Sequence, residues 1–322
     1  MTTGPSSAAI VESGPGMRLH LAYHGCYDLD PLRLLEPLPP TVELFATAGT
    51  TGAAGRGERL PLDGYGLWLR DLEHRSVSYT NLLVPSDPEA TWQHQHRLET
   101  WGLCPIPVVE VAQDHRVLGR YLEAGYRHIA LSRPPDPRHT RWPLDTALPW
   151  LRRGFQMAGP GVGFHLLEAT SWALVAALPW YSADVHGWAD ALERQEVVWF
   201  EPGQGYFRQA AMGKSPRWQL VGLDGPASPR WQLLGLEGPD SPLQSAYERR
   251  AVLAGLAAEA WQAAETWLGD EFGPVTIAGT DQTGPRLYLE SLCGVQLAHR
   301  GFAHLAALAD LPTRPDGSHD AT

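Results

Sequence analysis

The feature that most constrains the fold is a repeated alternation of short apolar runs with longer segments of helical periodicity. Most of the apolar runs lack polar–apolar alternation, so we interpret them as strands buried on both faces. The candidate strands are Arg18–Tyr23, Val42–Ala48, Tyr79–Pro85, Ile106–Val111, His128–Ser132, Val162–Leu167, Trp180–Val185 and Val197–Glu201. The alternation predicts a parallel α/β fold, and eight strands favour a TIM (β/α)8 barrel over an open sheet.

The segments between these strands carry helix start and stop signals. Pro88–Trp101 opens with Asp87 as its expected N-cap and is followed by Gly102, and the segment Asp114–Glu123 ends in the same way at Gly125. The other predicted helices are Leu62–Glu73, Leu144–Met157, Ser171–Leu178 and a long one at Gln244–Leu268. Helices of this length between strands fit the crossover connections of a parallel sheet.

The chain is expected to form a single domain over residues 17–309, with a disordered leader at 1–16 and a disordered tail at 310–322. An insertion at about 205–243 contains a tandem repeat, in which Ser215–Ala227 and Ser228–Asp240 match at ten of thirteen positions. Two copies are too few for a solenoid. We favour a duplication within a surface insertion, folded as a pair of β-hairpins, over an arginine–tryptophan surface that stacks on a base or a partner.

Charge and composition exclude several classes of protein. The net charge of −11 argues against a globally basic nucleic-acid binder. One local exception is the segment Arg127–Arg153, where six arginines face two aspartates, a net charge of +4. This segment could contact the phosphates of tRNA or DNA, or it could form a solvated helix face.

The cysteines and the apolar segments indicate a soluble cytoplasmic protein. The three cysteines are isolated and form no CxxC pair, which excludes a cysteine-framed zinc site and fits a reducing compartment. The apolar run Trp172–Tyr181 is too short to span a membrane. Residues 1–16 have no basic segment and are not expected to be a signal peptide.

Metal and cofactor motifs are absent from the sequence. There is no HExxH, no P-loop, no GxSxG and no GxGxxG after a strand. His94 and His96 lie two apart within a predicted helix, so they point in different directions. His20 and His24 lie four apart on a predicted strand. From these spacings we expect neither a metal site nor a cofactor.

Carboxylates at predicted strand ends are more informative. Asp184 lies at the end of the seventh predicted strand among aromatic residues, where a buried carboxylate must be paired or used. Barrel enzymes carry their catalytic groups at these ends. Glu110 and Glu168 also follow strands and could face the barrel mouth. Each of the three could instead be solvated, and Asp184 could cap a helix.

Four segments, in this order and spacing, resemble a known family. They are Tyr79–Trp92, Gly102–Val108, Tyr126–Leu131 and His165–Ser171, the last followed by Pro179–Asp184 and Trp188. The resemblance is to the queuine tRNA-ribosyltransferase-like superfamily, and within it to phage and bacterial proteins of the DeoxyPurine in DNA protein A type, which exchange a base for a 7-deazapurine. It covers about residues 40–190 and implies a TIM barrel.

The resemblance also implies roles for residues of the site. Asp184 matches the aspartate that attacks the sugar C1′ as a covalent nucleophile. Thr47 stands where the family has an aspartate that handles the proton of the leaving base, and threonine cannot ionise near neutral pH. Leu83 replaces the aspartate that recognises the purine edge, and Glu168 replaces a glycine near the base.

Three functions follow from this pattern. The first is base exchange or N-glycosidic chemistry with altered base specificity, in which Asp184 is the nucleophile and Glu168 or Glu110 takes over proton transfer. The base-binding residues would be Thr47, Gly49, Leu83, Asp87, Ser132 and His165. The second is an inactive relative that acts as a binding or scaffold subunit for a protein partner. The third is a hydrolase of small nucleosides.

Overall fold

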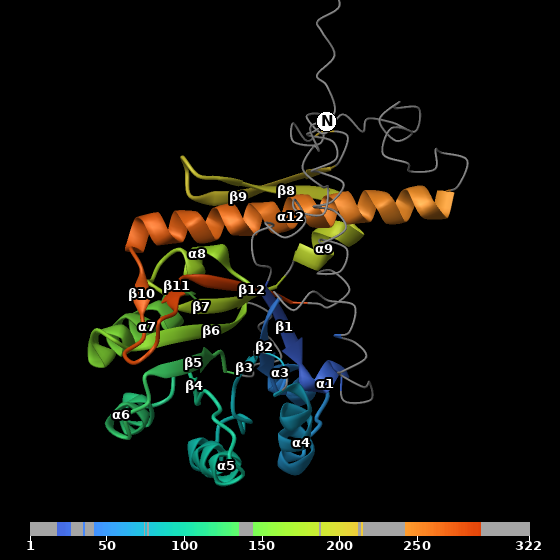
Figure 1. Ribbon diagram of the computed structural model, residues 1–322. Helices are drawn as coiled ribbons and strands as arrows, with labels where there is room; N and C mark the ends of the chain where they lie inside the picture. Colours follow the sequence, from blue (N-terminus) through green and yellow to red (C-terminus); the bar gives the residue numbers. More distant parts are fainter. Residues whose placement is uncertain are drawn as a thin grey trace, which may run out of the picture.

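An eight-stranded curled sheet, parallel throughout, organises the computed structural model, which describes residues 18–26, 35, 42–73, 75, 77–134, 144–186, 188–211, 214 and 242–290 (Figure 1). The strand order is β3-β2-β1-β12-β7-β6-β5-β4. The strands are β1 (Arg18–Ala22), β2 (Glu43–Thr47), β3 (Val77–Tyr79), β4 (Val108–Glu110), β5 (His128–Ser132), β6 (Gly163–Ala169), β7 (Ser182–Val185) and β12 (Arg286–Glu290). This is a TIM-like α/β arrangement.

The two edge strands of this sheet meet at one point. Thr80, directly after β3, forms an isolated parallel bridge with Ile106, shortly before β4. The Ile106 N–H donates to the Tyr79 carbonyl at 2.7 Å, and the Asn81 N–H donates to the Ile106 carbonyl at 2.9 Å. The Asn81 side chain then accepts from the Val108 N–H at 3.0 Å and takes the place of a backbone partner.

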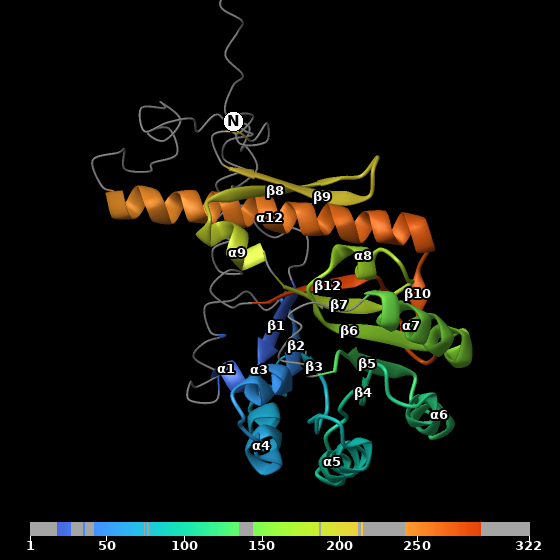
Figure 2. The same cartoon turned by 180° about the vertical axis from the view of Figure 1, so that it is seen from behind.

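The helices between the strands are α1 (Tyr23–Cys26), α3 (Thr50–Gly55), α4 (Leu62–Leu72), α5 (Pro88–Thr100), α6 (His115–Glu123), α7 (Leu144–Ala158), α8 (Trp172–Val175) and α9 (Trp188–Glu193). The longer helices among them pack on the outer face of the sheet, whereas the short α1 and α3 follow the carboxyl ends of β1 and β2, and α9 contacts α12 (Pro242–Phe272) and β8 (Glu196–Glu201) (Figures 1 and 2). Asp87 caps α5 as predicted, because its side chain accepts from the Ala90 N–H at 2.9 Å. His24 lies in α1 and not on the predicted strand.

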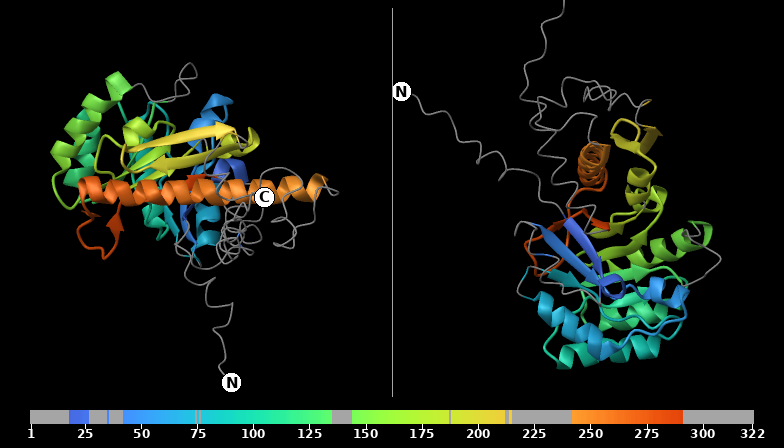
Figure 3. Two further views of the ribbon diagram at one scale, coloured as in Figure 1. Left: turned by 90° about the horizontal axis from the view of Figure 1, so that it is seen from above. Right: turned by 90° about the vertical axis from the view of Figure 1, so that its right-hand side faces the viewer.

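The segment predicted as the eighth strand of the sheet is a strand, but it lies outside the sheet. Val197–Glu201 falls in β8 (Glu196–Glu201), which pairs antiparallel with β9 (Tyr206–Ala211) outside the sheet. This hairpin packs along the long helix α12 (Pro242–Phe272), as the view from above shows (Figure 3). Its apolar face is buried by aromatic contacts such as Phe207 on Trp261, with ring centroids 4.2 Å apart. The sheet's eighth strand is β12, which lies between β1 and β7.

Other predicted segments lie partly or wholly outside the described residues. These are the leader at 1–16, both copies of the repeat and the tail at 310–322. Of the expected insertion at about 205–243, the described part includes β9, which pairs with β8. A short antiparallel pair, β10 (Val275–Thr276) and β11 (Thr283–Gly284), joins α12 to β12. No helix in the described ranges combines the length and apolarity needed to cross a membrane.

Apolar side chains fill two regions. The larger lies between the sheet and the helices that cover it. The smaller lies within the curl of the sheet, where buried residues of five strands and two adjoining segments converge. Its members are Phe45, Leu83, Ile106, Val108, Ala130, Leu167 and Tyr288. Side chains from both edges of the sheet therefore share one inner core.

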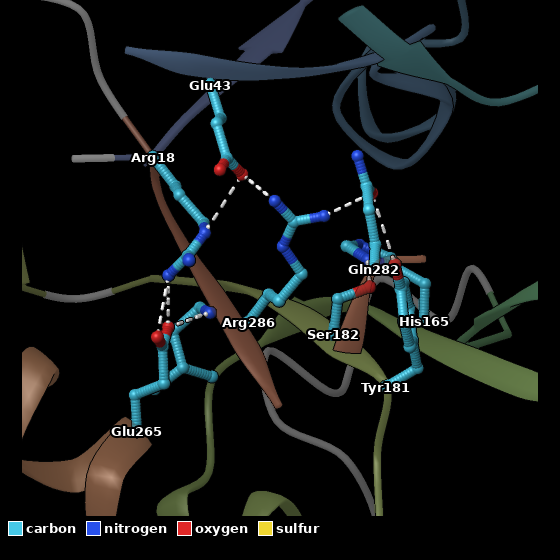
Figure 4. A network of polar contacts seen from close by, with 9 residues as sticks. Arg18, Glu43, His165, Tyr181, Ser182, Glu265, Gln282 and Arg286 are labelled. Atoms are coloured by element: carbon cyan, nitrogen blue, oxygen red, sulfur yellow. Dashed lines mark hydrogen bonds and ion pairs between the residues drawn. The ribbon is translucent and has the colours of Figure 1, made fainter. Parts of the chain in front are cut away.

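Charged groups join the amino ends of three strands to α12 (Figure 4). Arg18, at the start of β1, lies 3.1 Å from Glu43 on β2 and 2.6 Å from Glu265 on α12. Glu265 also accepts from the Leu287 N–H at 2.8 Å, and Arg286 at the start of β12 pairs with Glu43. This network lies at the amino ends of the strands, whereas Asp184 lies at their carboxyl ends. In barrel proteins the contacts at the amino ends serve stability.

Candidate functional site

A small cavity opens at the carboxyl ends of the strands. It measures about 320 Å³ with the space at its mouth included, but the enclosed space is only about 20 Å³, enough for one or two water molecules. Its lining includes six of the residues that sequence analysis proposed, which are Thr47, Gly49, Leu83, Ser132, Glu168 and Asp184. Residues from β2, β5, β6 and β7 and from the segment after β3 therefore meet in one place, as a parallel sheet with aligned strand ends requires.

Asp184 on β7 is completely buried and surrounded by hydrogen-bond donors. The backbone N–H of Glu168 reaches both carboxylate oxygens, at 3.0 Å from Oδ1 and 2.9 Å from Oδ2. His165 Nε2 lies 3.0 Å from Oδ1, and His186 Nε2 lies 2.9 Å from Oδ2. Burial alone would raise the pKa of Asp184, but His20, His165 and His186 together hold that pKa well below its ordinary value.

His165 lies behind Asp184, among the residues of the inner core. Its ring stacks on Phe45, with centroids 3.8 Å apart and planes 9° from parallel. Its Nδ1 lies 2.7 Å from Ser182 Oγ (Figure 4). Since Nε2 contacts Asp184, both ring nitrogens have fixed partners. Burial lowers the pKa of His165. This predicted base-binding residue does not line the cavity and instead holds the carboxylate that does.

Glu168 occupies a strained position on β6. Its φ of 54° is in the left-handed region, and the pairing of β6 with β7 shifts register between Leu166 and Ala169. The Glu168 side chain lines the cavity, and Arg133 Nε lies 3.4 Å from its Oε2. Burial and the nearby charge of Asp184 raise the pKa of Glu168.

The wall formed by the end of β2 depends on a tight backbone approach. Thr47 Oγ1 lies 2.9 Å from His20 Nε2, which fixes both side chains. Gly49 has φ 69°, and a Cβ at this position would lie 3.0 Å from the Cβ of His24. Glycine is therefore required here both for the conformation and for the close approach of β1.

Glu110 and Asp87, both proposed as site residues, lie outside the lining of this cavity. Glu110 is buried at the end of β4 and accepts from the Ser86 N–H at 2.9 Å. Asp87 caps α5 and lines a larger neighbouring cavity of about 1230 Å³, again with its mouth included. The two cavities share Thr50 and Leu83.

The arginine-rich segment does not form one patch. Arg127 precedes β5, so it lies at the amino edge of the sheet, whereas Arg133 follows β5 at the carboxyl edge. The strand β5 therefore separates these two arginines. Arg138 and Arg141 fall outside the described residues.

Two histidines of the site were missed by sequence analysis. His20 on β1 is buried, with Nδ1 3.6 Å from Asp184 Oδ2, and His186 follows β7 directly. One donor atom from each of His20, Asp184 and His186 lies within 4.8 Å of the other two. The spacing of His186 two residues after Asp184 was a signal on the sequence, but the nearness of His20 depends on strand order.

Comparison of the chain with models of protein families, with curated proteins and with solved structures finds no match. The function is therefore argued from the chemistry of the site itself.

Proposed function

We propose that this chain is an enzyme that breaks an N-glycosidic bond of a nucleobase or nucleoside in the cavity at the strand ends. We also propose that the sheet closes at the Thr80–Ile106 bridge into a TIM barrel. One observation carries the functional proposal. A fully buried carboxylate, Asp184, lies in a cavity whose lining also includes a second carboxylate, Glu168.

Breaking the bond between C1′ and a base nitrogen leaves positive charge on the sugar. A fixed carboxylate stabilises that charge, and in base exchange it also adds to C1′, so that one difficult step becomes two displacements. Asp184 has this part in the proposal. Glu168 lines the same cavity and is placed to exchange a proton with the departing base. In this proposal Glu168 transfers the proton, because Thr47 has no ionisable group with which to do so.

The lining of the cavity offers the kinds of contact that a planar base needs, and side chains must move apart to admit one, because the enclosed space is about 20 Å³. Leu83, Val108 and Leu167 supply apolar surface, and the hydroxyls of Thr47 and Ser132 supply polar contacts. Leu83 cannot accept hydrogen bonds from the purine edge, so the preferred base differs from that of the family which the sequence resembles. The left-handed backbone at Glu168, where that family has glycine, supports the resemblance.

The preferred substrate in this proposal is a small molecule. The net charge is −11, and Arg127 and Arg133 lie at opposite edges of the sheet, which gives little support to a tRNA or DNA acceptor. Hydrolysis of a nucleoside is the second candidate. Both oxygens of Asp184 already accept hydrogen bonds, which makes the carboxylate a weaker nucleophile. In hydrolysis a water molecule attacks C1′ in its place.

The test is a thermal-shift screen of the purified protein against guanine, 7-deazapurines, other bases and nucleosides, followed by chromatography of the products. A ligand at 100 times its Kd adds about 2.7 kcal/mol of stability. Asp184→Asn should abolish turnover, and Asp114→Asn, at the exposed N-cap of α6, is the matched control. Binding without turnover would favour a scaffold subunit. The absence of both binding and turnover would overturn the proposal.

A further inference from the structure

We propose that His20, Asp184 and His186 bind one divalent transition-metal ion, with Zn²⁺ the first candidate. Their three donor atoms, His20 Nδ1, Asp184 Oδ2 and His186 Nε2, lie within 4.8 Å of one another. They come from β1 and from the end of β7, which lie on either side of β12. The inference rests on the cavity of the proposed function but not on the reaction assigned to it.

The separations fit shared ligation of one ion. Two ligand atoms, each at about 2.0–2.1 Å from a tetrahedral Zn²⁺, lie roughly 3.4 Å apart. The carboxylate oxygen lies 3.6 Å from His20 Nδ1 and 2.9 Å from His186 Nε2, and this second contact, a hydrogen bond without the ion, must lengthen by about 0.5 Å when both atoms ligate it. The distance to His20 is too long for a good hydrogen bond and suits two ligands of the same ion. The two imidazole rings lie 6.0 Å apart, between centroids, which leaves space for an ion between them.

The atoms behind the ligands are also fixed. The other nitrogen of His20 lies 2.9 Å from Thr47 Oγ1. The other oxygen of Asp184 accepts from the Glu168 N–H at 3.0 Å and lies 3.0 Å from His165 Nε2. Metal-binding histidines and carboxylates are oriented by this kind of outer contact. Two of the three ligands are therefore held from behind, as in an ordered metal site.

The donor set selects the class of ion. Two imidazoles and one carboxylate bind zinc in hydrolytic enzymes and iron(II) in oxygenases, and in both classes other coordination positions stay open. Asp184 lines the cavity, so an open position of the ion faces the space where the substrate of the proposed function binds. Zinc ranks first because it needs no redox partner.

A bound ion changes the reaction expected in the cavity. Asp184 Oδ2 becomes a ligand and no longer attacks C1′. A water molecule on the ion takes its place. The water oxygen bonds to C1′ as the C1′–N bond breaks. The base leaves with the electron pair of that bond and with the proton that the water gives up. The products are the free sugar and the free base, so hydrolysis replaces base exchange.

The test measures metal binding without any substrate. Protein purified without chelator is analysed for metal by mass spectrometry, then stripped and titrated with Zn²⁺, Fe²⁺ under anaerobic conditions, and Co²⁺. We expect close to one equivalent of ion per chain, a rise in Tm on Zn²⁺ addition, and d–d absorption bands on Co²⁺ addition. His186→Ala should weaken Zn²⁺ binding at least tenfold. His96→Ala, on the exposed face of α5, is the matched histidine control.

A variant of an outer contact keeps the test sharp if His20 variants fail to fold. Thr47→Val retains the shape of the side chain and removes the oxygen that holds His20, so metal affinity should fall by about 10- to 100-fold. Wild-type protein with no bound metal, no Tm shift and no Co²⁺ spectrum would overturn the inference, whatever its activity. Metal binding with no action on nucleosides would keep the inference and remove the proposed function.

Discussion

The backbone N–H of Glu168 donates to both carboxylate oxygens of Asp184, at 3.0 and 2.9 Å. The same residue carries a left-handed φ of 54°, at the register shift between β6 and β7. Strain of this kind persists where surrounding contacts hold it, and it is concentrated at functional sites. The irregularity of β6 and the orientation of the Asp184 carboxylate are therefore one structural unit, and the two residues are best tested together.

Replacing Asp184 with asparagine should strongly destabilise the protein as well as remove activity. The NH₂ group of the asparagine amide would face donors from Glu168, His165 or His186, so that two donors would meet where a carboxylate oxygen now accepts. Breaking one partner of a buried charged contact costs about 3–5 kcal/mol. Urea denaturation of Asp184→Asn beside Asp87→Asn measures the effect. The Asp87 variant should remain close to wild type, because asparagine caps helices as well as aspartate does. Equal stability of the two variants would contradict this account.

Replacing Glu168 with glycine should separate its backbone role from its carboxylate. Glycine adopts the left-handed conformation without the cost of about 1–2 kcal/mol that other residues bear. Glu168→Gly should therefore be about 1 kcal/mol more stable than Glu168→Ala, while both variants lose turnover. Denaturation curves and a product assay on the same samples decide this. A glycine variant less stable than the alanine variant would contradict the backbone strain assigned to position 168.

The buried carboxyl of Glu110 should reduce stability at neutral pH. Burial raises the pKa of Glu110 above its ordinary value of 4.5, and the Ser86 N–H only partly offsets this. The folded state thus binds the proton more tightly than the unfolded state. Stability falls as the pH rises from about 4.5 through the folded-state pKa.

The Glu110→Gln variant keeps an oxygen for Ser86 and removes the charge. It should melt at a higher temperature than wild type at pH 7, with the difference vanishing below about pH 4. Glu123→Gln, at the exposed end of α6, serves as the control and should show no such trend. A Glu110 variant that is less stable than wild type at pH 7 would reverse the sign of this argument.

Removing Glu265 should loosen α12 from the sheet. Its carboxylate accepts from Arg18 at 2.6 and 2.7 Å and from the Leu287 N–H at 2.8 Å. Glu265→Ala leaves these donors without their acceptor, so it should cost about 2–4 kcal/mol, as loss of a partly buried charged partner does. Glu271→Ala, exposed on the same helix, should cost less than about 0.5 kcal/mol. Similar melting of the two variants would contradict a role for the network.

Six strands of the sheet could be predicted from apolar runs, because strands buried on both faces give an unbroken signal, whereas the predicted strand Tyr79–Pro85 overlaps β3 only at Tyr79. The eighth, β12, could not be predicted. Arg286–Glu290 alternates polar and apolar residues and therefore resembles a strand with one exposed face, although Arg286 pairs with Glu43 and Tyr288 is buried in the inner core. The apolar run in β8 is more prominent, but α12 and not the sheet buries it.

The residues of the site also divide into those that the sequence could predict and those that it could not. Strand-end position was enough to predict that Asp184 and Glu168 lie at the carboxyl edge, and the cavity brings them together. It could not separate Glu168 from Glu110, because a register shift decides which side chain faces the cavity. His20 was overlooked because spacing rules compare residues near one another in the chain. Its nearness to Asp184 follows from strand order alone.

The place of β12 has a consequence for how the protein is made. His20 on β1 and Asp184 on β7 both leave the ribosome long before residues 286–290 of β12. Yet β1 and β7 are not neighbours, and each pairs with β12, where Tyr288 aligns with Asp184 and Glu290 with His20. During translation β1 and β7 therefore cannot take their final places until β12 has been made. A ribosome that stops before residue 286 would release a chain with every residue of the site and no site.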